Sequence, residues 1–379
     1  MKELALLFLK LGTIGFGGPA AHIAMMEDEV VRRRGWMSPE RFLDLLGATN
    51  LIPGPNSTEM AIHIGYLRAG WKGLLLAGVC FIVPAVAITL LLAHLYVAYG
   101  AIPQLQPFVA GIRPAIIAVI LAAVFRLSRP SLKNRFAFGL GVIVVFLNLY
   151  GFDEIILLVG SGVLGLLWNY RNQLRQTTIG LMALLPLLNS QTLRTFQVVD
   201  ATVTGASLAG LGLFFLKIGS ILYGSGYVLV AFLQSGLVDT RHWLTQSQLF
   251  DAIAVGQFTP GPVLSTATFI GYLILGLPGA SVATVGIFLP SFVLVLVSNP
   301  FIPRLRKSPL ASGFLDGVNS ASLGLMLAVT IKLALTALTG VGPWLIVLIA
   351  SVLVLRWNIN AAWIVIGSAI LGWLFSLWF

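Results

Sequence analysis

The chain has 379 residues, of which 58% are hydrophobic and 9% are charged, and its formal net charge at pH 7 is +10. Soluble domains carry charge on about 25% of their residues, so a chain this apolar cannot cover a water-facing surface and has lipid as its main solvent. The positive charge does not indicate nucleic-acid binding, because the basic residues stand in short loops between apolar segments. We therefore expect a polytopic membrane protein.

Apolar stretches that predict membrane helices follow one another along the first half. They lie at residues 4–26, 73–98, 105–126, 136–150 and 154–169. Between the first two, residues 39–67 break at Pro53-Gly54-Pro55 into two pieces that are each shorter than the about 20 residues of a full crossing. Helix breakers between pieces this short predict a re-entrant hairpin or a broken helix.

The second half repeats the first in a nearly constant register, with a slip of one residue. The matched positions are Phe8-Leu9-Lys10-Leu11-Gly12 with Phe215-Leu216-Lys217-Ile218-Gly219, Trp36 with Trp243, Asp44 with Asp251, Pro53-Gly54-Pro55 with Pro260-Gly261-Pro262, and Gly111 with Gly317. Membrane composition alone would give shared leucines, not a shared order of Lys, Trp, Asp and Pro-Gly-Pro. We therefore infer a duplication.

Five expected crossings in each half, an odd number, predict that the second half runs inverted, as in many secondary transporters. Most loop Lys and Arg residues then fall on one side, which the positive-inside rule makes cytoplasmic and which leaves the N-terminus outside. Arg241 is the exception. The predicted fold is an all-α membrane protein with a first repeat at 1–171, an interfacial cytoplasmic linker at 172–204 and an inverted repeat at 205–379.

Each Pro-Gly-Pro tripeptide ends one short segment and opens another. The helix that follows would present unpaired N–H groups and a positive dipole end at membrane depth, which favours an anion. Two such ends that approach from opposite sides would hold a tetrahedral oxyanion; the alternative is that the tripeptides only kink a helix. The candidate residues are Pro53, Gly54, Pro55, Asn56, Ser57, Thr58, Pro260, Gly261, Pro262, Ser265 and Thr266.

Three cations are further candidates for the substrate site. Lys10 and Lys217 lie about two turns inside their segments, where a charge needs an anion or a carboxylate as partner unless it reaches the interface. Arg113 suits forked binding of oxyanion oxygens, or it faces water at the outer end of its segment. Small residues at matched positions would let the backbone approach the ligand or a second helix: Gly17, Gly18, Gly224 and Ser225.

Four titratable residues are candidates for carrying a coupling proton: Asp44, Glu59, His63 and Asp251. For the two aspartates a structural cap or ion pair is an equal alternative. The one cysteine, Cys80, and four scattered histidines offer no disulfide and no cluster of metal ligands, so we expect no metal and no cofactor.

Four stretches carry information beyond their hydropathy. They read FLKLGTIGFGGPAAHIAMMEDEVV and GWMSPERFLDLLGATNLIPGPNSTEMAIHIGY in the first half, and FLKIGSILYGSGYV and VGQFTPGPVLSTATFIGY in the second. Together they resemble the chromate ion transporter family in its long, two-domain form. The resemblance implies export of chromate across the cell inner membrane by an antiporter driven by the proton motive force, and chromate resistance.

Two alternatives stay open at this point. The first alternative is a carrier or channel for sulfate or another anion, since physical chemistry alone specifies only an anion of oxyanion size. An embedded enzyme that acts on lipid phosphates would need a clustered base and nucleophile, and no catalytic spacing is present. We therefore expect a transporter and no enzyme, with the bilayer and an oxyanion as its partners; a homodimer stays open.

Overall fold

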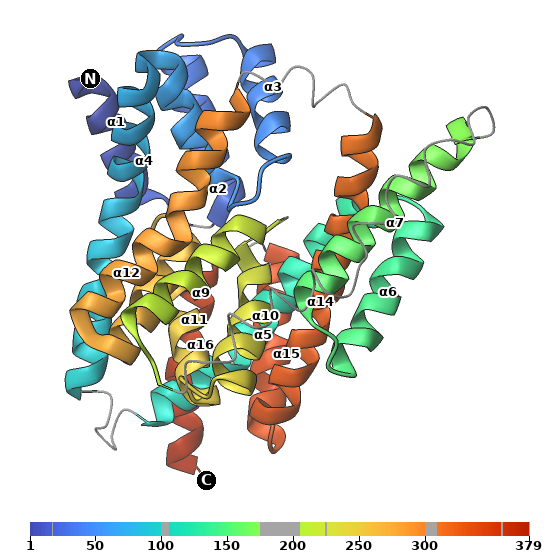
Figure 1. Ribbon diagram of the computed structural model, residues 1–379. Helices are drawn as coiled ribbons and strands as arrows, with labels where there is room; N and C mark the ends of the chain where they lie inside the picture. Colours follow the sequence, from blue (N-terminus) through green and yellow to red (C-terminus); the bar gives the residue numbers. More distant parts are fainter. Residues whose placement is uncertain are drawn as a thin grey trace.

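The computed structural model describes residues 1–16, 18–99, 106–174, 205–223, 226–299, 309–357 and 359–378. Within these ranges all regular elements are helices (Figure 1). Four of the described helices are long and apolar enough to cross a membrane: Ser57–Tyr99, Ala110–Arg129, Val263–Ser298 and Leu310–Ala337. The predicted all-helical membrane protein is confirmed at this level. The predicted linker falls largely on residues 175–204, which lie outside the described ranges.

The first half begins with α1 (Lys2–Ile14), α2 (Gly18–Glu27) and the π-helix η1 (Asp28–Arg33). Lys10 Nζ lies 2.7 Å from Glu29 Oε1, and Arg34 Nε lies 3.6 Å from Glu3 Oε1. Helix α1 therefore runs antiparallel to α2 and η1, and at Arg34 the chain has returned to the level of the N-terminus. The predicted single crossing over residues 4–26 is wrong, because helix α1 stops at its cap and the chain turns back.

A second hairpin follows, made of α3 (Pro39–Thr49) and the first arm of α4 (Ser57–Tyr99). Ser38 caps α3 and accepts a hydrogen bond from the Arg41 N–H at 3.3 Å. Arg68, at the end of the α4 arm, lies 5.1 Å from the ring centroid of Trp36, just before α3. Both ends of this hairpin therefore lie at one end of the molecule, and the Pro-Gly-Pro turn lies deep between them.

Helix α4 folds back on itself before it crosses. Ala69 and Gly70 have non-helical angles, and Gly70 has a φ of +59°, which glycine adopts without strain. A side chain on Gly65 would meet the carbonyl of Gly73, so the two arms pack backbone against backbone. Gly276 in the second half has the same break, with a φ of +64°.

The second half shows the same series of elements. It contains α9 (Leu208–Ile221), η4 (Gly226–Val228), α10 (Leu229–Leu233), η5 (Gln234–Thr240), α11 (Gln246–Phe258), η6 (Val263–Ser265) and α12 (Thr266–Ser298). Arg241 lies over the rings of Phe214 and Trp243, at 4.9 and 5.4 Å, as Arg34 lies over Trp36 at 5.8 Å. Arg241 is thus the counterpart of Arg34, which explains the exception to the charge rule.

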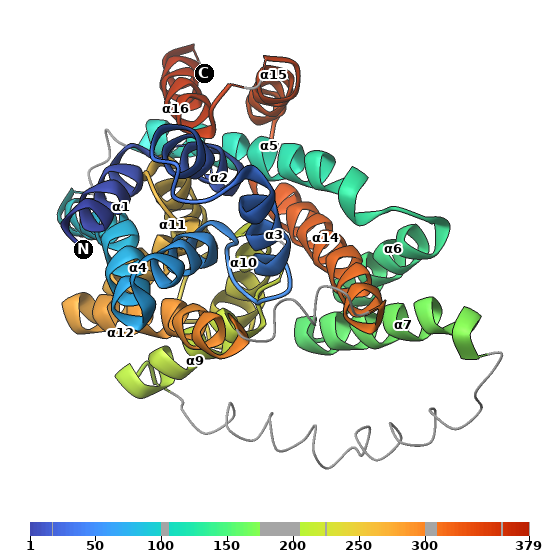
Figure 2. The same ribbon diagram turned by 90° about the horizontal axis from the view of Figure 1, so that it is seen from above.

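The remaining helices pack across the two halves. They are α5 (Gln106–Ser131), α6 (Arg135–Leu149), α7 (Glu154–Leu174), α14 (Pro309–Ala337), α15 (Val341–Trp357) and α16 (Ala361–Trp378). Helix α14 packs on α6 and α7, and α15 and α16 pack on α5. Glycines make these contacts close: Gly111 faces Gly372, and Gly165 faces Gly317. Seen from above, α1, α4, α9 and α12 lie on one side and α6, α7 and α14 on the other (Figure 2).

Candidate functional site

The two Pro-Gly-Pro turns each bond to the opposite half. The Gly54 N–H donates to the carbonyl of Leu222 at 2.7 Å, and the Gly261 N–H donates to the carbonyl of Gly15 at 2.8 Å. Gly15 and Leu222 are the C-caps of α1 and α9, which are matched in the sequence register. Gly54 and Gly261 both have positive φ, +143° and +89°, so a glycine is needed for each turn. The breaks of both halves therefore meet.

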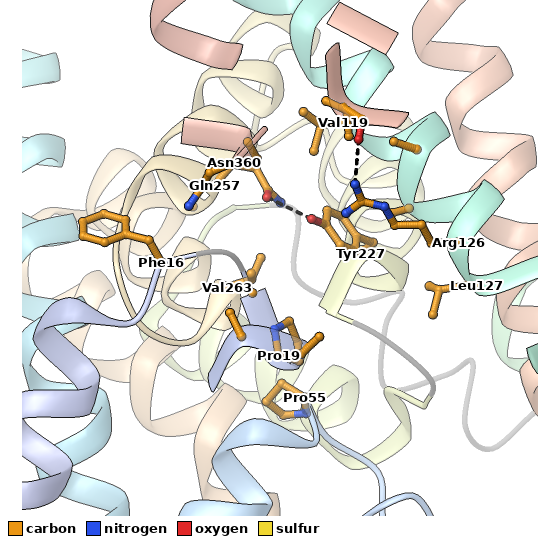
Figure 3. Close-up of a pocket in the computed structure, with 18 of the residues that line it drawn as sticks. Phe16, Pro19, Pro55, Val119, Arg126, Leu127, Tyr227, Gln257, Val263 and Asn360 are labelled. Carbon is orange, nitrogen blue, oxygen red and sulfur yellow. Dashed lines mark hydrogen bonds between the residues drawn. The ribbon is translucent and has the colours of Figure 1, made fainter. Parts of the chain in front are cut away.

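A cavity of about 570 Å³ lies beside these breaks (Figure 3). The first turn of α2, the first Pro-Gly-Pro turn, η6, the last turns of α5 and the start of α16 all contribute to its wall. Six polar side chains line it: Asn56, Arg126, Tyr227, Gln257, Thr259 and Asn360. The site thus combines one cation with neutral donors and backbone at a helix start, which suits a small anion.

Arg126 is the cation of this wall. It lies on α5, and its Nη2 donates to the carbonyl of Val354 at 2.8 Å. Tyr227 Oη donates to Gln257 Oε1 at 3.2 Å, and Figure 3 shows the guanidinium beside the Tyr227 ring. A guanidinium binds oxyanion oxygens in a fork, so Arg126 is placed to recognise a tetrahedral anion.

The sequence alone does not select Arg126 as a site residue, because this residue stands at the end of its apolar segment and is grouped with the basic residues of the loop that follows. It stands inside an apolar span that runs from Ala110 to Arg129. The signal that would have found it is the basic residue Lys332, at the matching place in the second half. A charge that recurs inside both copies of one span is a stronger indication of function than a charge in a loop.

Several predicted residues do line the cavity: Gly18, Pro55, Asn56 and Gly261. Pro53, Gly54, Pro260 and Pro262 shape the two turns behind this wall. Ser57, Thr58, Ser265 and Thr266 are buried one turn further along their helices and do not line it. Gly17, Gly224 and Ser225 lie outside the described residues.

The three predicted cations do not line the cavity. Lys10 forms an ion pair with Glu29, which also accepts from Arg34 Nη1 at 2.6 Å. This hydrogen bond from Lys10 lowers the pKa of Glu29 below its ordinary value. Lys217 is half-buried on α9, outside the wall. The positions of Lys10 and Lys217 inside their apolar segments did not distinguish a substrate cation from a cation that has a protein partner.

Arg113 belongs to a different cluster. It donates to Ser247 on α11, the helix that also carries Asp251. Asp251 is buried and accepts a 2.6 Å hydrogen bond from Tyr96 on α4. The structure therefore places Arg113 with a protein network at the far end of α4, away from the Arg126 cavity.

The coupling candidates separate by burial. Asp44 is exposed on α3, whereas Glu59 and His63 are fully buried one turn apart on α4. Ser291 of α12 donates to one oxygen of Glu59. In the part of the chain that the structure describes, the second oxygen of Glu59 and both ring nitrogens of His63 have no hydrogen-bond partner. Buried polar atoms without a partner are rare and indicate a functional role or bound water.

The described residues contain no group of three or more His, Cys, Asp or Glu side chains that could hold a metal ion.

Comparison with known proteins agrees with this arrangement. The family model described as chromate transporter matches the chain twice, over residues 2–166 and 209–373. A chromate transport protein of Cupriavidus metallidurans is 32% identical over 376 residues, which cover 98% of this chain and 92% of that protein. No solved structure matches the chain.

Two further relatives differ in length. A probable chromate transport protein of Synechococcus elongatus is 32% identical over 364 residues, covering 95% of this chain and 91% of its own length. An uncharacterized transporter of Bacillus subtilis is 28% identical over 130 residues, which are 34% of this chain and 73% of that protein. The second relative is therefore about the size of one half.

Proposed function

Because the chain belongs to the chromate transporter family, we propose that it is a secondary active transporter that exports chromate from the cytoplasm and binds it in the cavity beside Arg126. The observation that carries the proposal is the convergence of both Pro-Gly-Pro turns and a guanidinium on one cavity. Chromate is a tetrahedral dianion, and a site with one fixed cation and several neutral donors would hold it without neutralising it fully. Incomplete neutralisation favours release.

Contacts at the two ends of the molecule support an inverted arrangement of the two halves. Residues 1–34 and 39–68 form hairpins that end beside Trp36, in the part of the chain richest in arginine. In the second half, the equivalent arm of α12 ends at Tyr272, whose hydroxyl lies 2.9 Å from His94 near the far end of α4. The hairpins of the two halves thus open toward opposite ends, which supports inverted repeats at 1–171 and 205–379.

The basic end is the cytoplasmic end by the positive-inside rule. Arg34 and Lys133 both lie there, and Arg34 lies beside Glu3, so the N-terminus is cytoplasmic. This orientation replaces the expected outside N-terminus, which depended on a crossing over 4–26. The Arg126 cavity lies on the basic side of the molecule's middle, so we assign this structure to a state that loads from the cytoplasm.

We propose Glu59 and His63 as the groups that couple export to protons. Both are buried, Glu59 lies about one turn and His63 about two turns beyond Asn56 in the cavity wall, and Ser291 ties Glu59 to the opposite half. A proton that moves on or off this pair would change the contact between α4 and α12. Asp44 is exposed and Asp251 is bonded to Tyr96, which favours structural roles for both.

Chromate uptake into everted membrane vesicles tests the proposal, with Arg126→Gln compared against Arg129→Gln. Arg129 is exposed on the same helix and is a matched control for charge. Loss of a charge-assisted hydrogen bond costs about 1.5–3 kcal/mol, so Arg126→Gln should weaken chromate uptake by about tenfold or more and Arg129→Gln should not. Equal uptake by Arg126→Gln and wild type would refute the site.

The same vesicles separate chromate from the rival substrate. Sulfate in excess should reduce chromate uptake only modestly if chromate is the substrate. If sulfate is taken up faster than chromate and its uptake also depends on Arg126, the Arg126 cavity is the binding site and sulfate is the substrate.

A further inference from the structure

Arg126 and Lys332 stand at equivalent places in two antiparallel helices. Helices α5 and α14 pack side by side, with Ser320 Oγ donating to the Ser131 carbonyl at 3.2 Å and Lys133 Nζ lying 2.7 Å from Asp316. The end of α5 therefore lies beside the beginning of α14. With a rise of about 1.5 Å per residue, Lys332 lies about 10 Å from Arg126 along the helix axes, on the opposite side of the middle.

The Arg126 position adjoins the cavity in this structure. Ala122, Ala123 and Leu127 surround Arg126 and line the cavity. Lys332 does not line this cavity, and its neighbour Leu333 is fully buried, whereas the matching Leu127 is half-buried in the cavity wall. We therefore call the Arg126 end of the pair α5–α14 the open end and the Lys332 end the closed end.

The closed end also has a contact that the open end lacks. Asn360 and Ala361, at the start of α16, line the cavity, and their counterparts at the start of α7 are Asp153 and Glu154. Glu154 is buried and accepts a 3.3 Å hydrogen bond from Asn148 Nδ2 and a hydrogen bond from the Ser235 hydroxyl on η5. This contact joins α7 to η5 of the second half at the closed end.

The Lys332 ammonium is a charge inside a membrane span whose side chain has no partner among the described residues. It is half-buried in a span that is apolar enough to cross a membrane. Across the described ranges, no hydrogen bond or ion pair is made by its side chain, whereas Lys10 has Glu29. A charge in a membrane helix needs a partner, and the partner that this state lacks has to come with another state.

Inverted repeats allow the two halves to exchange conformations, so that the open end closes and the closed end opens. We propose that Lys332 is the outward-facing counterpart of Arg126 and binds the oxyanion when the cavity opens to the outer face. The inference rests on the proposed function. An ammonium offers no planar fork, so Lys332 would hold the anion less tightly than Arg126, which would favour release of the anion at the outer face.

Two measurements on purified protein and vesicles test Lys332, with Lys332→Gln, Lys332→Arg and the exposed control Lys133→Gln. Equilibrium binding of chromate to the detergent-solubilised protein reports the cytoplasmic cavity, and vesicle uptake reports the full cycle. We expect Lys332→Gln to bind chromate within about twofold of wild type but to transport it at least about tenfold more slowly. Lys332→Arg should restore transport, and Lys133→Gln should resemble wild type in both assays.

The outcomes separate the two proposals. If Lys332→Gln transports chromate at the wild-type rate while Arg126→Gln is impaired, the Lys332 side chain only extends to the membrane–water interface and the inference is overturned. Loss of equilibrium binding in Lys332→Gln would also overturn it, because Lys332 would then belong to the cytoplasmic site. Wild-type behaviour of Arg126→Gln would instead remove the proposed function. If Lys332→Gln does not fold, chromate protection of Lys332→Cys from an impermeant thiol reagent, in a Cys80→Ser background, decides the question.

Discussion

Replacing Gly261 with alanine tests the contact between the two halves at its narrowest point. Gly261 has a φ of +89°, and its N–H bonds to the Gly15 carbonyl. An added Cβ would lie 2.9 Å from the Cβ of Ala85 and 3.2 Å from the carbonyl oxygen of Gly12. The substitution therefore strains the backbone and overpacks the contact of the second Pro-Gly-Pro turn with α1 and α4.

The cost has two parts. A left-handed backbone costs a residue with a Cβ about 1–2 kcal/mol, and overpacking a tight site costs about 1–3 kcal/mol. We expect the free energy of unfolding to fall by about 2–5 kcal/mol, or the turn to shift and export to fail. Gly139→Ala is the matched control, because a Cβ there would meet nothing within 4 Å. That helical substitution should leave stability unchanged or raise it by up to about 1 kcal/mol.

Thermal unfolding in lipid nanodiscs and chromate uptake by vesicles measure both variants. A Gly261→Ala protein as stable and active as Gly139→Ala would contradict the reasoning, since the turn would then have room that the structure denies it. Loss of stability in both variants would point to general sensitivity of the helices and not to the junction.

Three further outcomes follow from the ion pairs and buried acids. Lys10→Ala should lower the unfolding free energy by at most about 1 kcal/mol and leave export intact, because the Lys10 side chain is 49% exposed and lies outside the cavity wall; impaired export with normal stability would return Lys10 to the substrate site. The lowered pKa of Glu29 stabilises the protein above about pH 4.5, and this stability is lost as the pH falls through the folded-state pKa; Glu29→Gln should lack that loss in acid unfolding curves. Glu59→Gln should make chromate uptake independent of the proton gradient, whereas Asp44→Asn should leave uptake dependent on it. Loss of the dependence in Asp44→Asn alone would make Asp44, and not Glu59, the coupling residue.

The repeated order of motifs and the helix breaks at Pro-Gly-Pro are features that a sequence can reveal, because they depend on local rules. Proline and glycine end helices wherever they stand, and a matched register in two halves requires related surroundings. Gly54 and Gly261 also need positive φ, which restricts the residue type.

Hydropathy could not reveal the hairpin at residues 1–34. The break near Gly15 is as apolar as its flanks, so a running average treats both arms as one crossing. What turns the chain back is tertiary, since Lys10 pairs with Glu29 and Arg34 with Glu3 across the hairpin. Charge counting based on that single crossing predicts an outside N-terminus, whereas the hairpin supports the cytoplasmic N-terminus proposed above.

The sequence could not decide which cation lines the cavity for a related reason. Lys10 and Arg113 were selected because each stands in an apolar segment, yet protein groups engage both: Glu29 contacts Lys10, and Ser247 contacts Arg113. Arg126 faces the cavity only because α5 packs across the second half. Which side of a membrane helix a charge faces depends on this long-range packing, which composition does not encode.

Anomalous diffraction at the chromium absorption edge, from crystals soaked in chromate, is the most direct test of where the anion binds. The account predicts one strong chromium peak between Asn56 and Gly261, placed so that the oxygens of the chromate accept hydrogen bonds from the Arg126 guanidinium. A chromium peak beside Lys10 or Arg113, with the Arg126 cavity empty, would contradict it.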